Sequence, residues 1–265
     1  MAGRHRSDDL LYAVSKVPEV TAYFWGVKVL TTALGESTSD YLVHVISPYL
    51  AVGAGFVAFA IAIIAQFSVR QYVTWVYWVA VAMVAVFGTM VADAMHVALH
   101  VQYKVSAAAF AVLVAVVLCL WYASERTLSI HSITTPRREF FYWATVILTF
   151  ALGTATGDLF ASTFHLGYLA SALIFTALIA VPAAGYRMGL SGVAAFWTAY
   201  ILTRPIGASF ADYLGKPHSS GGLGIGSGPI CLVTAALFVC VIAYLAATRK
   251  DMPGTPAAAR QRALV

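Results

Sequence analysis

Carboxylates recur at one fixed place in four similar stretches of this chain. In each stretch a Trp is followed ten residues later by a Gly and five residues after that by an Asp. The four sets are Trp25–Gly35–Asp40, Trp78–Gly88–Asp93, Trp143–Gly153–Asp158 and Trp197–Gly207–Asp212, and an aromatic residue precedes every Trp. One shared register indicates an internal fourfold repeat. An Asp that recurs within it is a candidate to bind a cation or to carry protons.

Histidines follow three of these Asp residues closely and extend the candidate chemistry. Carboxylate and imidazole groups are ligands for Mn²⁺, Zn²⁺ and related ions, and they also serve proton relays. The candidate metal ligands, each three to seven residues beyond an Asp, are His44, His96, His100 and His165. A plainer alternative is an Asp that is solvated or caps a loop, because each lies about 20 residues along an apolar stretch, near a membrane surface.

Three further charged residues lie deeper within apolar stretches. They are Lys28, Glu36 and Arg204, and each would cost several kcal/mol if it faced lipid. We assign Glu36 to the cation or proton path and Lys28 and Arg204 to charge balance or gating. Pro205, directly after Arg204, removes a backbone hydrogen bond and favours a broken or kinked helix. The alternative is a fixed internal ion pair, for instance between Arg204 and Glu36.

The composition indicates the environment that must hold these residues. The chain has 265 residues, of which 61% are hydrophobic and 10% charged, and its mean hydropathy is +0.82. A soluble domain would carry about a quarter charged residues. We therefore expect an all-α, polytopic membrane bundle. Eight spans are predicted, at residues 19–42, 47–67, 72–100, 105–124, 139–163, 166–186, 192–214 and 227–247.

The spans alternate between polar and plain apolar helices, and each repeat is one of each. Because every repeat crosses twice, the four polar helices must run in the same direction, as parallel repeats. We divide the chain into a first half (19–124), a linker (125–138) and a second half (139–247). Residues 1–18 and 248–265 form terminal segments. The repeat Trp is expected to mark a membrane interface, and the repeat Gly to allow close helix packing.

Lysine and arginine are distributed unequally between the two sides of the predicted membrane. One side holds both termini and most of the basic residues, whereas the other has only Lys104 and Lys216. The positive-inside rule then places both termini in the cytoplasm. This distribution also accounts for the pI of 9.1, so we expect no nucleic-acid partner. The Gly-rich loop at 215–228 is expected to be a flexible connector, with a mobile or re-entrant lid as the alternative.

Several motifs resemble one family of bacterial membrane proteins, catalogued as DUF347. The matching motifs are Lys16-Val-Pro-Glu-Val-Thr21, Thr32-x-x-Gly-Glu36, Phe141-Tyr-Trp143, Phe150-Ala-Leu-Gly-Thr154, Ala211-Asp212 and Gly221-Gly-Leu-Gly224. The resemblance spans about residues 15–247 and is least in the second repeat. It implies four tandem repeats of two transmembrane helices in a bacterial inner membrane, and it implies no particular activity.

These observations favour a transporter or exporter of small cations. A divalent metal such as Mn²⁺ is the favoured substrate, with proton coupling as a further option. The partners expected are the lipid bilayer and the cation, and a homo-oligomer stays open. One alternative is a haem or zinc protein that uses His100 and His165. Another is a sensor or scaffold without transport. An enzyme is less expected, because GxSxG, HExxH and Walker motifs are absent.

Overall fold

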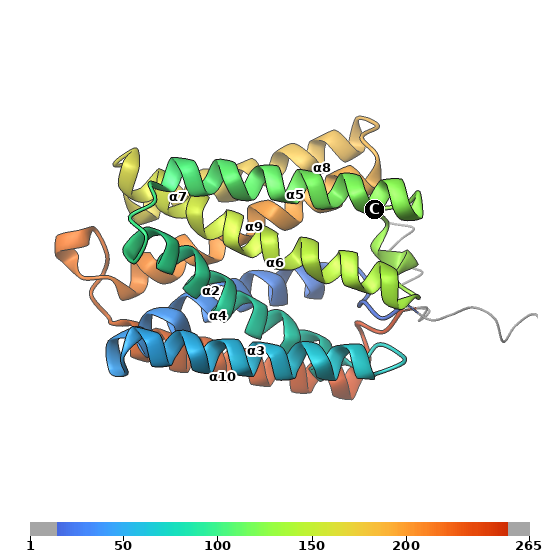
Figure 1. Ribbon diagram of the computed structural model, residues 1–265, viewed down its shortest axis with the longest axis horizontal. Helices are drawn as coiled ribbons and strands as arrows, with labels where there is room; N and C mark the ends of the chain where they lie inside the picture. The colour runs from blue at the N-terminus through green and yellow to red at the C-terminus, as the bar shows by residue number, and fades with distance from the viewer. Residues whose placement is uncertain (1–14, 254–265) are drawn as a thin grey trace, which may run out of the picture.

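The computed structural model describes residues 15–253 and shows a bundle of helices, with no strand in that range (Figure 1). The outer parts of both predicted terminal segments, residues 1–14 and 254–265, lie outside the described residues. Within residues 15–253, helical segments occupy all eight of the predicted ranges. The all-α fold class is therefore confirmed.

The four polar helices form the centre of the bundle. They are α2 (Ala22–Val45), α4 (Thr74–Val97), α6 (Pro136–Asp158) and α9 (Gly192–Gly215). A hydroxyl side chain caps the first turn in three of them, at Thr21, Thr135 and Ser191. A π-helical turn, η2 (Leu159–Thr163), extends α6 directly after Asp158. The helix α9 continues through Pro205, so of the two predicted options, a broken or a kinked helix, the break is absent.

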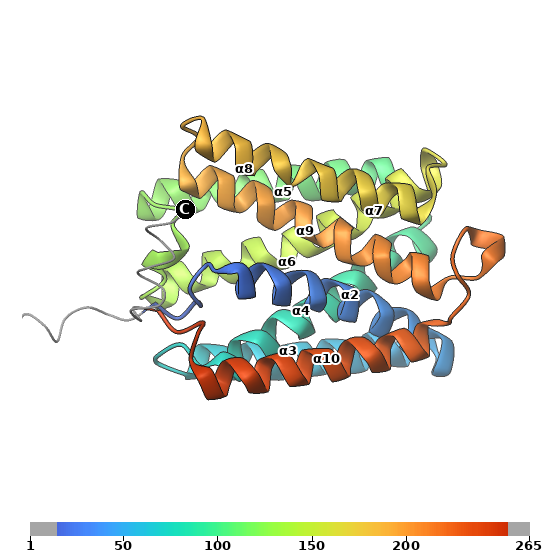
Figure 2. The same cartoon turned by 180° about the vertical axis from the view of Figure 1, so that it is seen from behind.

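The apolar helices form an outer layer. They are α3 (Pro48–Ser68), α5 (Tyr103–Glu125), α7 (Gly167–Leu178) with α8 (Ala180–Arg187), and α10 (Ser227–Thr248). Short 3-10 turns lie in two loops, η1 (Ile130–Ser132) and η3 (His218–Ser220). Each outer helix packs mainly on the inner helix of the next repeat: α3 on α4, α5 on α6, α7 and α8 on α9, and α10 on α2. The last contact closes a ring (Figure 2).

By length and composition, six helical segments of the described chain are apolar enough to cross a membrane. The inner helices α2 and α9 are also 24 residues long but fall outside this set, since they carry charged residues and many small polar ones. The ring explains how such helices are tolerated. Other helices cover them, whereas the most apolar window of each outer helix is only 22% buried. We conclude that this is a membrane protein whose outer helices face lipid.

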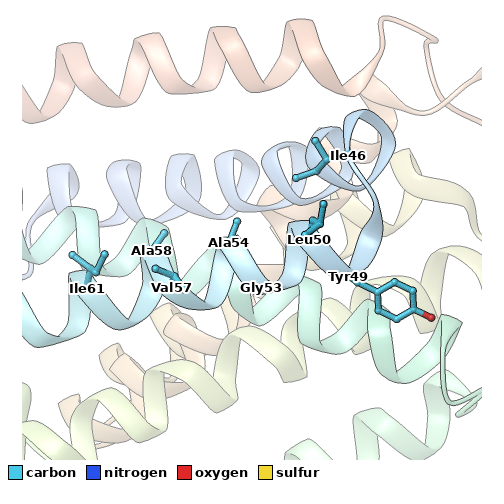
Figure 3. Close-up of a pocket in the computed structure, with 8 residues that line it drawn as sticks. All are labelled: Ile46, Tyr49, Leu50, Gly53, Ala54, Val57, Ala58 and Ile61. Carbon is cyan, nitrogen blue, oxygen red and sulfur yellow. The ribbon is translucent and has the colours of Figure 1, made fainter.

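A shallow hollow on the outer face of α3 illustrates this lipid-facing surface (Figure 3). It has a volume of about 570 Å³ and is lined by Ile46 and by α3 residues that include Leu50, Gly53, Val57 and Ile61. All eight lining residues are apolar except for the hydroxyl of Tyr49. Nothing in this hollow offers a charged group or a metal ligand, so it has no part in the site described below.

The inner helices run in the same direction, as the parallel repeat predicted, and both described chain ends meet at one end of the bundle (Figure 1). There the Glu19 amide donates to the Asp251 carbonyl at 3.0 Å. We call this the terminal end, and the opposite end, where the repeat Asp residues lie, the aspartate end. Neighbouring inner helices pack on each other both within and between the two predicted halves, so the halves form one ring.

The Trp residues join neighbouring repeats near the terminal end. In each repeat the aromatic residue before the Trp contacts the Trp of the next repeat. The ring-centroid distances are 5.6 Å for Phe24–Trp78, 5.6 Å for Tyr77–Trp143, 6.1 Å for Tyr142–Trp197 and 5.6 Å for Phe196–Trp25. The predicted interfacial role is therefore wrong for Trp78, Trp143 and Trp197, which are buried. Aromatic neighbours from adjacent helices, rather than lipid headgroups, surround them.

The repeat glycines make a second ring of contacts, as expected from close helix packing. Each Gly lies against the residue seven positions after the Trp of the next repeat. A Cβ atom added at the Gly would lie 2.5 Å from Ala85 at Gly35, 3.1 Å from Phe150 at Gly88, 2.2 Å from Arg204 at Gly153 and 1.8 Å from Thr32 at Gly207. At three of the four contacts a methyl group does not fit without movement of the facing helix.

This packing predicts a large difference between two Gly→Ala variants. At Gly207 the new Cβ meets the Thr32 hydroxyl and lies 2.7 Å from the Val29 carbonyl oxygen, so we expect Gly207→Ala to destabilise the fold by about 1–3 kcal/mol. At Gly53, in α3, nothing lies within 4 Å, and Ala should be neutral or slightly stabilising. Thermal unfolding in detergent checks the pair. Equal unfolding midpoints would contradict the ring of glycine contacts.

Candidate functional site

The inner helices carry a stripe of residues that leads from the Trp region to the Asp. Four residues make slightly more than one helical turn, so every fourth residue lies on the same face. Counted from each Trp, the stripe comprises the residues at −1, +3, +7, +11 and +15, and the repeat Asp is the +15 member. The four stripes include most of the buried charged residues of the inner helices, namely Lys28, Glu36, Arg204 and Asp212, which places a charged axis inside the ring.

Arg204 lies in the middle of this axis. Its Nη2 donates to Glu36 Oε2 at 2.8 Å, to Thr154 Oγ1 at 2.7 Å and to Thr89 Oγ1. Glu36, Thr89 and Thr154 are the +11 residues of the first three repeats, each directly after the repeat Gly. One guanidinium from α9 therefore ties all three other inner helices together. The predicted Arg204–Glu36 ion pair is confirmed, with both side chains buried.

Lys28 lies nearer the terminal end and is fully buried as well. Its Nζ is 3.7 Å from the centroid of the Phe150 ring and 4.2 Å from that of the Tyr200 ring. These aromatic faces stabilise an ammonium group through cation–π contacts. Within the described residues Lys28 Nζ has no hydrogen-bond partner. It is thus a second basic residue on the axis, one turn from the level of Arg204, and its role in charge balance stays a prediction.

The aspartate end of the axis holds a close group of carboxylates. One ligand oxygen each from Glu36, Asp40 and Asp93 lie within 4.8 Å of one another. Glu36 is buried, and the two Asp residues are half-buried. Two of these residues, at +11 and +15 of the first repeat, come from α2. The third, at +15 of the second repeat, comes from α4. Of the described residues this is the one group of three His, Cys, Asp or Glu side chains with spacing suited to a metal ion.

The other two repeat Asp residues lie near this group. Asp158 is half-buried and interacts electrostatically with Glu36 and Asp40. Asp212 is buried, and its Oδ1 has no hydrogen-bond partner in the described structure. None of the four repeat Asp residues is fully exposed. The plain reading of these residues as solvated surface groups therefore fails for Asp212, and the other three retain partial access to solvent.

Lys216 completes the group from the first residue after α9. Its Nζ lies 2.5 Å from Asp40 Oδ2 and 3.7 Å from Asp212 Oδ1. Burial alone would lower the pKa of this ammonium, but the Asp212 and Asp40 carboxylates raise it well above its ordinary value. Lys216 therefore stays charged at neutral pH, and it brings a positive charge into the carboxylate group.

The four predicted histidine ligands lie around this group rather than in it. His44, His100 and His165 are exposed, and His96 is half-buried. His96 stacks on Tyr103 and contacts the Val101 carbonyl through Nδ1 at 2.9 Å. His100 and His165 have positive φ angles of 53° and 54° at helix ends, a conformation that His adopts more readily than most residues. Their structural position is explained without a metal, and a role in metal binding stays a prediction.

The terminal end of the axis is closed by side chains. The Tyr77 and Tyr142 hydroxyls are hydrogen-bonded to each other in the aromatic layer. Beyond them, the buried Glu139 carboxylate accepts from Lys16 Nζ and, at 3.0 Å, from Gln66 Nε2. In the described residues these contacts fill the terminal end of the axis, whereas a pocket lined by Asp40 and Lys216 lies at the aspartate end.

A second buried carboxylate strengthens the closure. Asp251 accepts from the Tyr72 hydroxyl and, at 3.3 Å, from Thr74 Oγ1. Burial and the Asp251 carboxylate raise the pKa of Tyr72 well above its ordinary value, so Tyr72 keeps the proton that it donates. Chain segments from both ends of the sequence are thus fastened across the terminal end of the ring.

Sequence analysis missed several residues of this site. Thr89 and Thr154 are detectable as the +11 positions once the repeats are aligned on Trp and every fourth residue is compared. Lys216 is the +19 residue of the fourth repeat, where the other repeats have His44, Val97 and Ser162, so it continues the stripe one turn beyond Asp212. Its role becomes visible only when the loop after α9 is placed over Asp40.

Fold and site together define a membrane protein built from tandem two-helix repeats around a buried, charged axis. Residues 76–127, 141–188 and 195–251 match a family model described as a repeat of unknown function, DUF347. These matches cover more than half of the chain, and the chain belongs to this family. They include the second repeat, in which the sequence resemblance is least, and leave out the first. No curated protein and no solved structure matches the chain.

The buried ion pair leads to a prediction on stability. Glu36→Gln leaves the Arg204 charge without a counter-charge and should destabilise the fold by about 3 kcal/mol. Thr89→Val removes one neutral acceptor of the same guanidinium and should cost about 1 kcal/mol. Unfolding in detergent measures both.

A double variant separates the ion pair from simple loss of packing. Glu36→Gln combined with Arg204→Met removes both charges, and it should be more stable than Glu36→Gln alone. Additive losses in the double variant would show that the two side chains do not act as a pair.

Proposed function

We propose that this protein is a membrane transporter of small cations and that the group of Glu36, Asp40 and Asp93 is its cation site. The observation that carries the proposal is the short spacing of these three carboxylates inside a ring of helices. Carboxylates within a membrane protein are costly unless they are paired or hydrated, and they commonly mark ion or proton paths. The repeated Asp residues provide such groups from all four inner helices at one level.

The ligand types favour a hard cation. The group is made of carboxylate oxygens, which suit Mn²⁺, Mg²⁺ and Ca²⁺ better than soft metals. A divalent ion such as Mn²⁺ is our preferred substrate, because two or three carboxylates balance its charge. Asp158 and Asp212, at the same level, would serve as further ligands or as proton carriers. Coupling of cation movement to protons would use these same carboxyl groups.

One-sided access supports a transporter rather than an open channel. The carboxylate group opens at the aspartate end, whereas the Tyr77–Tyr142 contact and the Glu139 network close the terminal end. Passage of an ion requires these contacts to part while the aspartate end closes. Between the two ends lies Arg204, whose charge would repel a cation unless Glu36 or another carboxylate compensates it.

Orientation follows from the distribution of basic residues. In a bacterial inner membrane, the positive-inside rule would place the terminal end in the cytoplasm and the carboxylate group toward the outside. The cation site is then filled from outside, or emptied to it if the protein exports its substrate. The contacts at the terminal end would act as the cytoplasmic gate.

Replacement of the cation ligands tests the proposal. Asp40→Asn and Asp93→Asn should each lower Mn²⁺ uptake into proteoliposomes at least about tenfold, because each removes a charged ligand from a site of three. Glu125→Gln is the matched control. It removes one carboxylate that pairs with Arg138 at 2.9 Å, outside the charged axis, and should leave uptake unchanged.

The outcome decides between transport and a structural role of the carboxylates. Uptake by Asp40→Asn and Asp93→Asn at the wild-type rate would contradict the proposed site. A wild-type protein that neither binds nor moves Mn²⁺, Mg²⁺ or Ca²⁺ would contradict cation transport, and would favour a sensor or scaffold.

A further inference from the structure

We propose that the Lys216 ammonium is a tethered cation that competes with the transported ion and must leave Asp40 before that ion binds. The inference rests on the proposed cation site and adds a built-in competitor to it. It assigns a function to the lysine one turn beyond the repeat Asp of the fourth repeat and to the Gly-rich loop that follows it.

The shared ligand Asp40 carries the argument. Asp40 belongs to the group whose ligand oxygens lie within 4.8 Å of one another, and its Oδ2 also lies 2.5 Å from Lys216 Nζ. A lysine ammonium is a compact positive charge with three donors, and it interacts with carboxylates as a point charge. Two positive charges at one carboxylate repel each other, so ammonium and metal ion compete for Asp40.

Lys216 also lies between carboxylates of two repeats, whose negative charges the cation would otherwise have to balance. Its Nζ lies 3.7 Å from Asp212 Oδ1, an atom with no hydrogen-bond partner. The ammonium thus partly neutralises Asp40 of the first repeat and Asp212 of the fourth. The ammonium keeps the empty site from holding unpaired carboxylates, and an incoming divalent ion would replace its single positive charge with two.

The Gly-rich loop holds Lys216 in this position. Backbone bonds fold the loop back over the end of α9, from Leu223 N to Tyr213 O at 2.6 Å and from Gly224 N to Lys216 O at 2.8 Å. Gly224 has a φ of 70°, which favours Gly, and a Cβ added at Gly222 would lie 2.1 Å from Lys216 O. The loop is thus an ordered clasp around the Lys216 backbone, unlike the flexible connector expected from its composition.

A pocket beside the ammonium gives the side chain somewhere to move. It has a volume of about 280 Å³, and its lining includes Asp40, His44, Lys216 and Ser227. The Lys216 side chain is 29% exposed, so its outer part already reaches solvent. Rotation of this side chain into the pocket frees Asp40 while the clasp stays in place.

Titration of purified protein in detergent with Mn²⁺ tests the competition. Lys216→Met keeps the length of the side chain and removes its charge, and we expect it to bind Mn²⁺ at least about tenfold more tightly than the wild type. Lys104→Met is the matched control, because Lys104 is exposed in the first turn of α5 and forms no ion pair with a carboxylate of the described residues. It should bind as the wild type does.

A second variant separates loss of the ammonium group from loss of folding. In Lys216→Ala, added propylammonium should occupy the vacated place and weaken Mn²⁺ binding, whereas the same concentration should have little effect on the wild type. Unchanged or weaker Mn²⁺ binding by Lys216→Met, or no effect of propylammonium on Lys216→Ala, overturns the inference. If Asp40→Asn still abolishes binding in that case, the cation site itself stands. If wild type and all variants fail to bind Mn²⁺, both proposals are contradicted.

Discussion

Close approach of the four inner helices is the constraint on which this structure depends. At each of the four interfaces a repeat Gly lies against the +7 residue of the next repeat, and a methyl group would press into it. Nearer the terminal end, the aromatic residue before each Trp packs in the same way on the Trp of the next repeat. Because every contact points to the next repeat in the same sense, four repeats close a ring without a free edge.

A closed ring determines what its inward stripe can hold. The +11 side chains converge, so that a single guanidinium from the fourth repeat reaches the +11 residues of the other three. Symmetry is broken there, because Glu36, Thr89, Thr154 and Ala208 occupy equivalent positions and only one is charged. At the next level all four repeats retain Asp. The repeats therefore share the carboxylate level and differ at the +11 level that Arg204 contacts, which separates a common site from a specialised centre.

Much of the fold was predictable because lipid imposes a simple pattern. Apolar length gave the spans, and repeat register gave their parallel direction. The Arg204–Glu36 pair was predictable as one option, since buried charges in apolar helices need partners. The role of Trp was mispredicted, because interface preference and aromatic packing both place Trp near a helix end. The contact of Lys216 with Asp40 was not predictable, because the two residues come from different repeats and their approach depends on how α9 packs on α2.

The central claim is that a cation binds among Glu36, Asp40 and Asp93 at the aspartate end of the charged axis. Anomalous X-ray scattering at the manganese edge, from crystals of the protein grown with Mn²⁺, tests it most directly. The account predicts one strong peak within coordination distance of carboxylate oxygens from Asp40 and Asp93, with the Lys216 ammonium moved away from Asp40. Peaks confined to exposed histidines such as His44 or His100, with Lys216 still on Asp40, would contradict it.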